Sequence, residues 1–149
     1  MVDKSVIGVE TPGSTIVVER GKIMECARSI LDDNPGYFGE DPPPTPTYSM
    51  AQAHWPMPES GSSQGEVFRK LGLDLLRVLH AGQEFEYLGE IEVGDVLTSK
   101  SRIADIYEKE GKRGGTLTFV VSETTFTNQR GEDVLISRST IVQTSKAAS

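Results

Sequence analysis

The residues best suited to chemistry lie in one short loop, Ile30-Leu31-Asp32-Asp33-Asn34-Pro35-Gly36-Tyr37-Phe38, and a second proline-rich stretch, from Asp41 to Tyr48, follows it almost at once. Pro35 restricts the residue before it to extended conformations, so a helix cannot continue through the loop. A loop held rigid between two helices is where a small domain places a substrate-binding or catalytic group. Asp32 is the first candidate, although an Asp before a turn also caps its own backbone.

Two histidines and one cysteine are further candidates, and each has a plainer interpretation. His80 is expected on the polar face of a strand, with Gly82, Glu84 and Glu86. There it could transfer protons, or it could be hydrogen-bonded within the sheet or near a dimer interface.

His54 is expected to pack beside Trp55 on a helix face rather than to do chemistry. Cys26 is predicted to be a small buried residue on the apolar face of another helix. A single cysteine excludes an intramolecular disulfide, and no Cys/His cluster has zinc spacing, so no metal site is predicted.

Apolar spacing predicts helices in the first half of the chain. Ile23, Cys26, Ala27 and Ile30 recur at helical spacing and predict a helix over 21–31. A second helix is expected over 45–55, with Thr45 as its N-cap and Pro46 in its first turn, and a third helical piece over 66–73.

From about residue 75 the apolar period becomes two, which predicts strands. They cover 79–87, 96–107, 116–127 and 133–144, joined by glycine-containing turns, and a short strand is expected at 15–18. The sequence therefore predicts a single α+β domain over residues 1–149. Its curved antiparallel sheet wraps around a central helix, for which 45–55 is the natural candidate.

Composition excludes several classes of protein. The net charge is −7 and the cations are scattered, so nucleic acid is not an expected partner. No apolar run approaches the roughly 20 residues that cross a bilayer. The first residues lack the basic and apolar regions of a signal peptide, so we expect a cytoplasmic protein without membrane association.

The loop and two later motifs together resemble a known family. Asp-x-Asn-Pro in the loop, a Pro-Thr entry to the next helix, Leu79-His80-Ala81-Gly82-Gln83-Glu84-Phe85-Glu86-Tyr87 and Ile91-x-Val93-Gly94-Asp95 are similar to the MaoC-like, hot dog-fold dehydratases. The nearest subgroup resembles the N-terminal, FAS1-like dehydratase type, which also occurs as the histidine-less subunit of two-subunit (3R)-hydroxyacyl-ACP dehydratases. The resemblance covers nearly the whole chain.

This resemblance implies an acid–base mechanism that the chain does not keep intact. The family's hydratases carry Asp-x-Asn-Pro-x-His, whose Asp and His act on water and the substrate β-position. Here Asp32, Asn34 and Pro35 remain, but Tyr37 occupies the histidine position. A tyrosine side chain ordinarily titrates near 10 and a histidine near 6.5, so the usual proton carrier is missing.

The resemblance further implies acyl-CoA or acyl-ACP as substrate, no tightly bound cofactor, and a homodimer or a heterodimer with a His-bearing hot dog subunit. The implied substrate-binding residues are Asn34, Pro35, Tyr37, Thr45, Thr47 and Tyr48, and backbone N–H groups at the start of the 45–55 helix would polarise the thioester carbonyl.

Four functions remain open. The chain is expected to be the non-catalytic, substrate-binding partner in a dehydratase/hydratase, or a self-sufficient hydratase that uses Asp32 with His80. The third function is that of a hot dog thioesterase, in which Glu84 or Asp95 would activate water. The fourth is that of an acyl-binding module without turnover.

Overall fold

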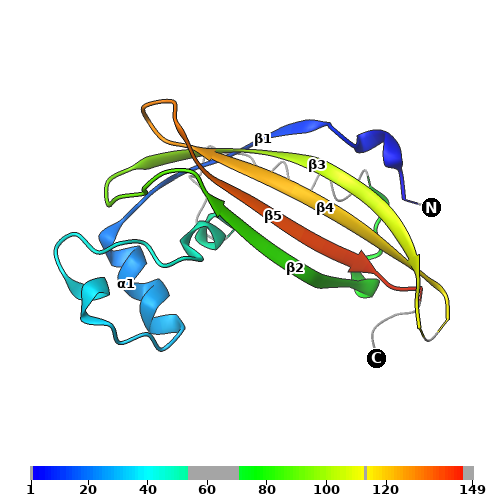
Figure 1. Ribbon diagram of the computed structural model, residues 1–149, viewed down its shortest axis with the longest axis horizontal. Coiled ribbons are helices and arrows are strands. Elements are labelled where there is room, and N and C mark those ends of the chain that lie inside the picture. The colour runs from blue at the N-terminus through cyan, green and yellow to red at the C-terminus, as the bar shows by residue number, and fades with distance from the viewer. Residues whose placement is uncertain (1, 54–70, 113, 146–149) are drawn as a thin grey trace.

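Five strands form one antiparallel sheet in the order β1-β3-β4-β5-β2, and the sheet is long and curved (Figure 1). The computed structural model describes residues 2–53, 71–112 and 114–145. The predicted positions of His54 and Trp55, and most of the helical piece over 66–73, lie outside this range. The described strands are β1 (Glu10–Val17), β2 (Val78–Tyr87), β3 (Val96–Glu110), β4 (Thr116–Thr127) and β5 (Asp133–Gln143).

One α-helix and four short 3₁₀ helices complete the described part. The expected α+β hot dog fold is confirmed. The α-helix confirms the one predicted from the apolar spacing, although Ile30 lies beyond its end and is exposed. The helices are η1 (Lys4–Val6), α1 (Arg20–Ser29), η2 (Pro35–Phe38), η3 (Tyr48–Ala53) and η4 (Leu75–Arg77).

The helix expected over 45–55 differs from the structure in its described part. It is a 3₁₀ helix that begins at Tyr48, whose N–H donates to the carbonyl of Thr45 at 2.9 Å. Pro46 therefore lies in a turn before the helix rather than in its first turn. The closely spaced prolines of this stretch limit how early a helix can start. In Figure 1, α1 and η3 lie together at one end of the sheet.

Bulges curve the sheet at defined places. The register shifts between Pro12 and Thr15 in the β1–β3 pair, and β1 is longer than the short strand expected at 15–18, because it also includes Pro12 and Gly13. A β-carbon at Gly13 would collide with Ser99 on β3, so only glycine allows this close approach. Further shifts occur between His80 and Gly82 and between Ile103 and Asp105. Bulges bend a strand and increase its twist.

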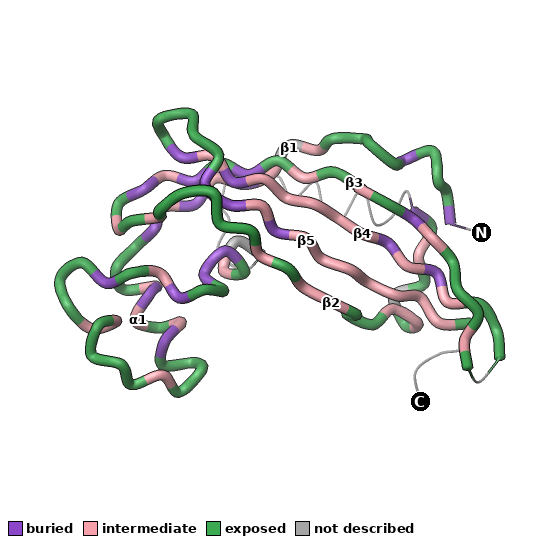
Figure 2. Tube along the Cα trace, viewed as in Figure 1, coloured by how far each residue is buried: buried purple, intermediate pink, exposed green. Residues whose placement is uncertain are grey.

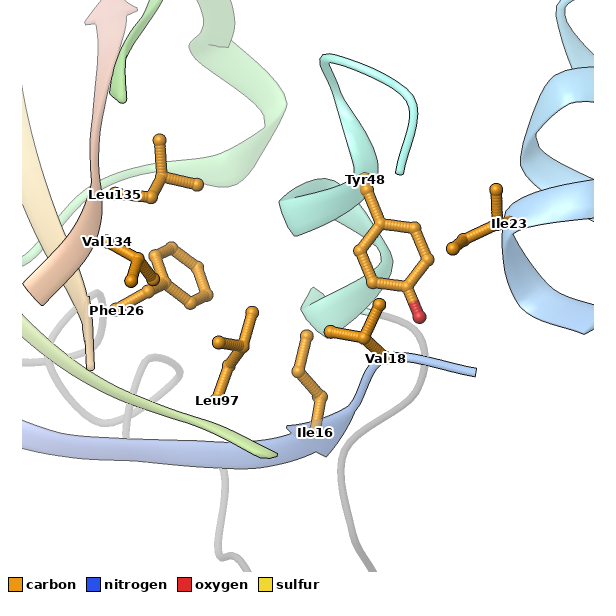
Figure 3. Close-up of a cluster of buried hydrophobic side chains, with 8 residues drawn as sticks. All are labelled: Ile16, Val18, Ile23, Tyr48, Leu97, Phe126, Val134 and Leu135. Atoms are coloured by element: carbon orange, nitrogen blue, oxygen red, sulfur yellow. The ribbon is translucent and has the colours of Figure 1, made fainter. Parts of the chain in front are cut away.

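The core forms two separate clusters on the face of the sheet that meets the helices. The first lies at the α1 end and combines residues from β1, α1, η3, β3, β4 and the start of β5 (Figure 3): Ile16, Val18, Ile23, Tyr48, Leu97, Phe126, Val134 and Leu135. The second lies towards the other end: Val2, Val6, Leu71, Ile103, Ile106 and Val120.

The opposite face carries a row of alternating charges across all five strands. In register these are Glu10, Arg102, Glu123, Arg138 and Glu84. Glu123 accepts from Arg102 at 2.6 Å and from Arg138 at 2.8 Å, and Arg138 reaches Glu84 at 2.7 Å. Burial alone would raise the pKa of Glu123, but its hydrogen bonds to the two arginines outweigh burial and lower it.

Asp95 fixes the turn between β2 and β3. Its carboxylate is buried and accepts from the backbone N–H of Glu92 at 2.9 Å and from the side chain of Gln129 at 2.8 Å. Gln129 in turn accepts from the N–H of Val96 at 2.9 Å. Burial raises the pKa of Asp95, but these hydrogen bonds and the charge of Arg130 outweigh it and lower the pKa overall. The β2–β3 turn and the β4–β5 turn are thereby tied together.

We predict that Asp95→Asn lowers the free energy of unfolding by about 1 kcal/mol at pH 7. Because the pKa of Asp95 is lower in the folded than in the unfolded chain, the charged form stabilises the fold above pH ~4 and this contribution is lost as the pH falls. Urea unfolding at pH 7 and at pH 3 measures the difference. Glu90→Gln, at an exposed position of the same turn, is the control and should change little; a deficit of D95N that stays constant with pH would contradict the prediction.

Candidate functional site

The loop predicted to carry chemistry is the C-terminal continuation of α1. The N–H groups of Leu31 and Asp32 donate back to the carbonyls of Arg28 and Ala27 at 3.1 and 3.0 Å. This closure requires Leu31 to adopt a φ of +58°, a left-handed conformation that normally favours glycine. Leu31 is also 91% exposed. The left-handed conformation is unfavourable for leucine. Because the Leu31 side chain is exposed, burial does not offset this cost.

The loop is built from successive turns in which side chains hold the backbone. The Asp32 carboxylate accepts from the N–H of Asn34, and the Asn34 side chain accepts from the N–H of Gly36, both at 3.0 Å. The N–H of Tyr37 then donates to the Asn34 carbonyl and starts η2. One oxygen of Asp32 is therefore occupied by its own loop, in the capping role that an Asp before a turn can take. The other oxygen has no hydrogen-bond partner in the described part of the chain.

Two arginines of α1 fasten the far side of the loop to the helix. The Arg20 Nε donates to the carbonyl of Gly39 at 2.7 Å, and the Arg28 guanidinium lies 5.4 Å from the centre of the Phe38 ring. Tyr37 is half-buried and packs against the core cluster at the α1 end. The side chain at the histidine position of the motif is thus part of the packing rather than a free group.

The proline-rich segment that follows is held to both edge strands of the sheet by tyrosines. The Tyr48 hydroxyl donates to the carbonyl of Val17 at 3.3 Å and accepts from the N–H of Glu19 at 3.2 Å. The Tyr87 hydroxyl, from β2, donates to the carbonyl of Pro46 at 2.5 Å. Burial raises the pKa of both phenols, so both remain donors.

Two hydroxyls of this segment are buried without a partner. Thr45 is 1% and Ser49 6% exposed, and neither side-chain oxygen has a hydrogen bond. Thr45 is among the site residues expected from the sequence. Ser49 is not, because no motif in the surrounding sequence points to it. The N–H groups of Tyr48 and Met50 already donate to the carbonyls of Thr45 and Thr47. These two N–H groups are therefore not free donors for the oxyanion site expected at the helix start.

His80 does not meet Asp32 within one chain. The Val78 end of β2, which carries His80, lies at the opposite end of the sheet from α1 and its loop (Figure 1). The expected face of His80 is also wrong: the bulge after it places His80 opposite Ile141, on the face of Gln83, not of Glu84. There it is exposed, and its Nε2 lies 3.4 Å from the Gln83 Oε1.

Known proteins resemble this chain along most of its length. The model of the FAS1-like dehydratase domain region matches residues 5–137. The chain belongs to the FAS1-like dehydratase family. A UPF0336 protein of Thermobifida fusca is 33% identical over 136 residues, which cover 84% of this chain and 82% of that protein.

Solved structures agree with the family in fold. The HadBC (3R)-hydroxyacyl-ACP dehydratase complex of Mycobacterium tuberculosis matches with a TM-score of 0.72 and 22% identity, over 92% of this chain and 96% of that one. The ChsH1–ChsH2 complex of the same organism matches with a TM-score of 0.69 and 18% identity, over 95% of this chain and 87% of that one. These likenesses confirm the MaoC-like hot dog fold predicted from the sequence.

Within this FAS1-like dehydratase chain, the carboxylates considered for a thioesterase already have partners. Glu84 pairs with Arg138 on the charged face, and Asp95 holds its turn. Cys26 is half-buried against the core, and burial raises the pKa of its thiol, as expected for a packing residue. Among the described residues there is no cluster of His, Cys, Asp and Glu that could hold a metal ion. Within the same residues, no helix combines the length and apolar character needed to cross a bilayer.

The conformation of Leu31 gives a stability prediction. Leu31→Gly should raise the free energy of unfolding by about 1 kcal/mol, because glycine adopts the left-handed region without steric cost. Thermal or urea unfolding measures it. Leu76→Gly is the matched control: Leu76 is 80% exposed but does not have a positive φ, so glycine there should destabilise. Equal effects of the two substitutions would contradict the prediction.

Proposed function

We propose that this chain is the substrate-binding, non-catalytic subunit of a (3R)-hydroxyacyl-thioester dehydratase or enoyl-thioester hydratase. The observation that carries the proposal is the loop: its Asp-x-Asn-Pro frame is complete and hydrogen-bonded, while Tyr37 stands packed where the family places its histidine. A frame without its proton carrier keeps the shape of the site and loses the acid–base step.

A second hot dog subunit would supply the missing proton transfer. Two structural neighbours, HadBC and ChsH1–ChsH2, are complexes, which supports such an assembly. The outer edges of β1 and β2 are not paired with another strand in the described part of this chain. A long unpaired edge is a natural place for another chain to add.

The proposed ligand is an acyl thioester of CoA or of an acyl carrier protein. The proposed contacts are Asn34, Pro35, Tyr37, Thr45, Thr47 and Tyr48. Among them Thr45 is distinctive, because its buried hydroxyl is an unused donor that a polar atom of the ligand could satisfy. The net charge of −7 opposes encounter with an acidic carrier protein and with the anionic phosphates of CoA alike, so the proposal leaves the carrier open. No tightly bound cofactor enters the proposal.

Hydration of crotonyl-CoA tests the proposal. The purified chain alone should show no turnover, whereas the chain co-purified with a hot dog subunit that carries Asp-x-Asn-Pro-x-His should hydrate the substrate. His80→Ala in this chain should leave the activity of the complex unchanged, because His80 lies far from the loop. The matched substitution of the partner's loop histidine should abolish turnover.

Different outcomes of the same assay distinguish the remaining functions. If the chain alone hydrates the substrate and His80→Ala abolishes this activity, the non-catalytic assignment is wrong and the chain is a self-sufficient hydratase. Release of free CoA without hydration would identify a thioesterase. Binding of the thioester without turnover in any combination would leave an acyl-binding module. Parallel assays with crotonyl-CoA and a crotonyl carrier protein compare the two carriers.

A further inference from the structure

The middle of the sheet's inner face is polar, although apolar residues continue that face on both sides. Six uncharged polar residues, here called the hydroxyl belt, lie in two neighbouring cross-strand rows: Ser101, Thr124 and Ser137 in one, and Ser122, Ser139 and Gln83 in the other. The next row towards α1 contains Phe126 and Leu135, and the next row the other way contains Val120 and Ile141. Phe85 and Ile103 complete the two rows, so the belt lies where the two core clusters approach each other.

The belt is neither closed off nor fully satisfied. Ser137 is 8% exposed and the other five are half-buried, which Figure 2 shows as the intermediate colour along the middle of β4 and β5. Ser101 and Thr124 share one hydrogen bond of 2.8 Å, and Gln83 donates to Ser137 at 2.7 Å. The hydroxyl of Ser139 has no hydrogen-bond partner among the described residues. A hydroxyl offers one donor and two acceptor positions, so the belt has unused capacity.

Stability alone does not account for these residues. A half-buried hydroxyl buries little apolar surface, whereas Val or Ile at the same positions would add apolar burial and suit a strand. The charged row from Glu10 to Glu84 crosses the sheet at the same level as the belt but on the opposite face. In the belt, the inner face is polar but carries no charge. It can therefore form hydrogen bonds with an uncharged polar group.

We infer that the hydroxyl belt binds a neutral oxygen-bearing group, a hydroxyl or a carbonyl, in the middle of the acyl chain of the thioester. This inference rests on the proposed function and names the kind of substrate for that same site. The half-buried Phe85 and Ile141, on either side of the belt, would contact the hydrocarbon before and after the polar group. Two rows of one face lie about 7 Å apart along a strand, so the belt suits one oxygenated position within a span of roughly five carbons.

Binding of two matched ligands tests the inference without any need for turnover. Calorimetry with dodecanoyl-CoA and 6-hydroxydodecanoyl-CoA is carried out on the chain and on its complex with the partner subunit. The hydroxylated ligand should bind about 10-fold more tightly, the equivalent of one added hydrogen bond of ~1.4 kcal/mol. Ser139→Ala should remove this preference and leave the affinity for dodecanoyl-CoA within about 2-fold.

Thr140→Ala is the control, because Thr140 is the next residue of β5, equally half-buried, but faces the charged side. It should leave both affinities unchanged. Ser122→Ala, in the same belt row as Ser139, is the second variant if S139A does not fold, and it should act in the same way as Ser139→Ala. Equal affinity for the two ligands, or a preference that survives both belt substitutions, overturns the inference but leaves the proposed function standing. If neither thioester binds, the proposed function fails as well.

Discussion

The register of the sheet is the constraint on which the rest of the structure depends, and Glu123 is at its centre. It accepts from an arginine on each neighbouring strand, and Arg138 extends the contact to β2. Side chains alternate between faces with a period of two, so a slip of one residue would exchange the faces of a strand. Such a slip would turn Arg102 or Arg138 to the inner face and away from Glu123, and an unpaired charge that is partly buried is unfavourable. The charged row thus keeps the middle of the inner face free of charge.

The loop keeps the frame of the Asp-x-Asn-Pro motif with a tyrosine at the position of its histidine. Asp32 and Asn34 are occupied with the turns that shape the backbone, and Arg20 and Arg28 hold the loop against α1. These roles do not involve proton transfer, so they survive the replacement of histidine by Tyr37. The phenol then fills core space beside the first cluster. Geometry and chemistry are separable in this loop, which explains why its motif identifies the family more securely than the activity.

The sequence alone was sufficient to predict the helices and strands that have long, regular patterns of apolar residues. The spacing of Ile23 and Ala27 predicts α1, and alternating residues predict β2 to β5. It failed where the geometry depends on partners far along the chain. Nothing local shows the bulge at Ala81, which moves His80 to the other face through pairing with β5. The short 3₁₀ helix at Tyr48 likewise reflects contacts with Val17 and Glu19 that spacing does not encode.

The belt was visible in the sequence but could not be interpreted there. Ser122 and Thr124 lie two residues apart, as do Ser137 and Ser139, and such alternation in an antiparallel sheet normally marks a solvent face. Only the register shows that these positions share a face with Phe126, Leu135 and Val120. A polar stripe on a sheet face that otherwise packs in the core departs from the pattern that favours folding. Such departures are expected at functional sites. In the proposed function the loop at one end of the sheet and the belt at its middle therefore have different tasks: the loop would hold the frame of the reacting end, and the belt would select what the rest of the substrate carries.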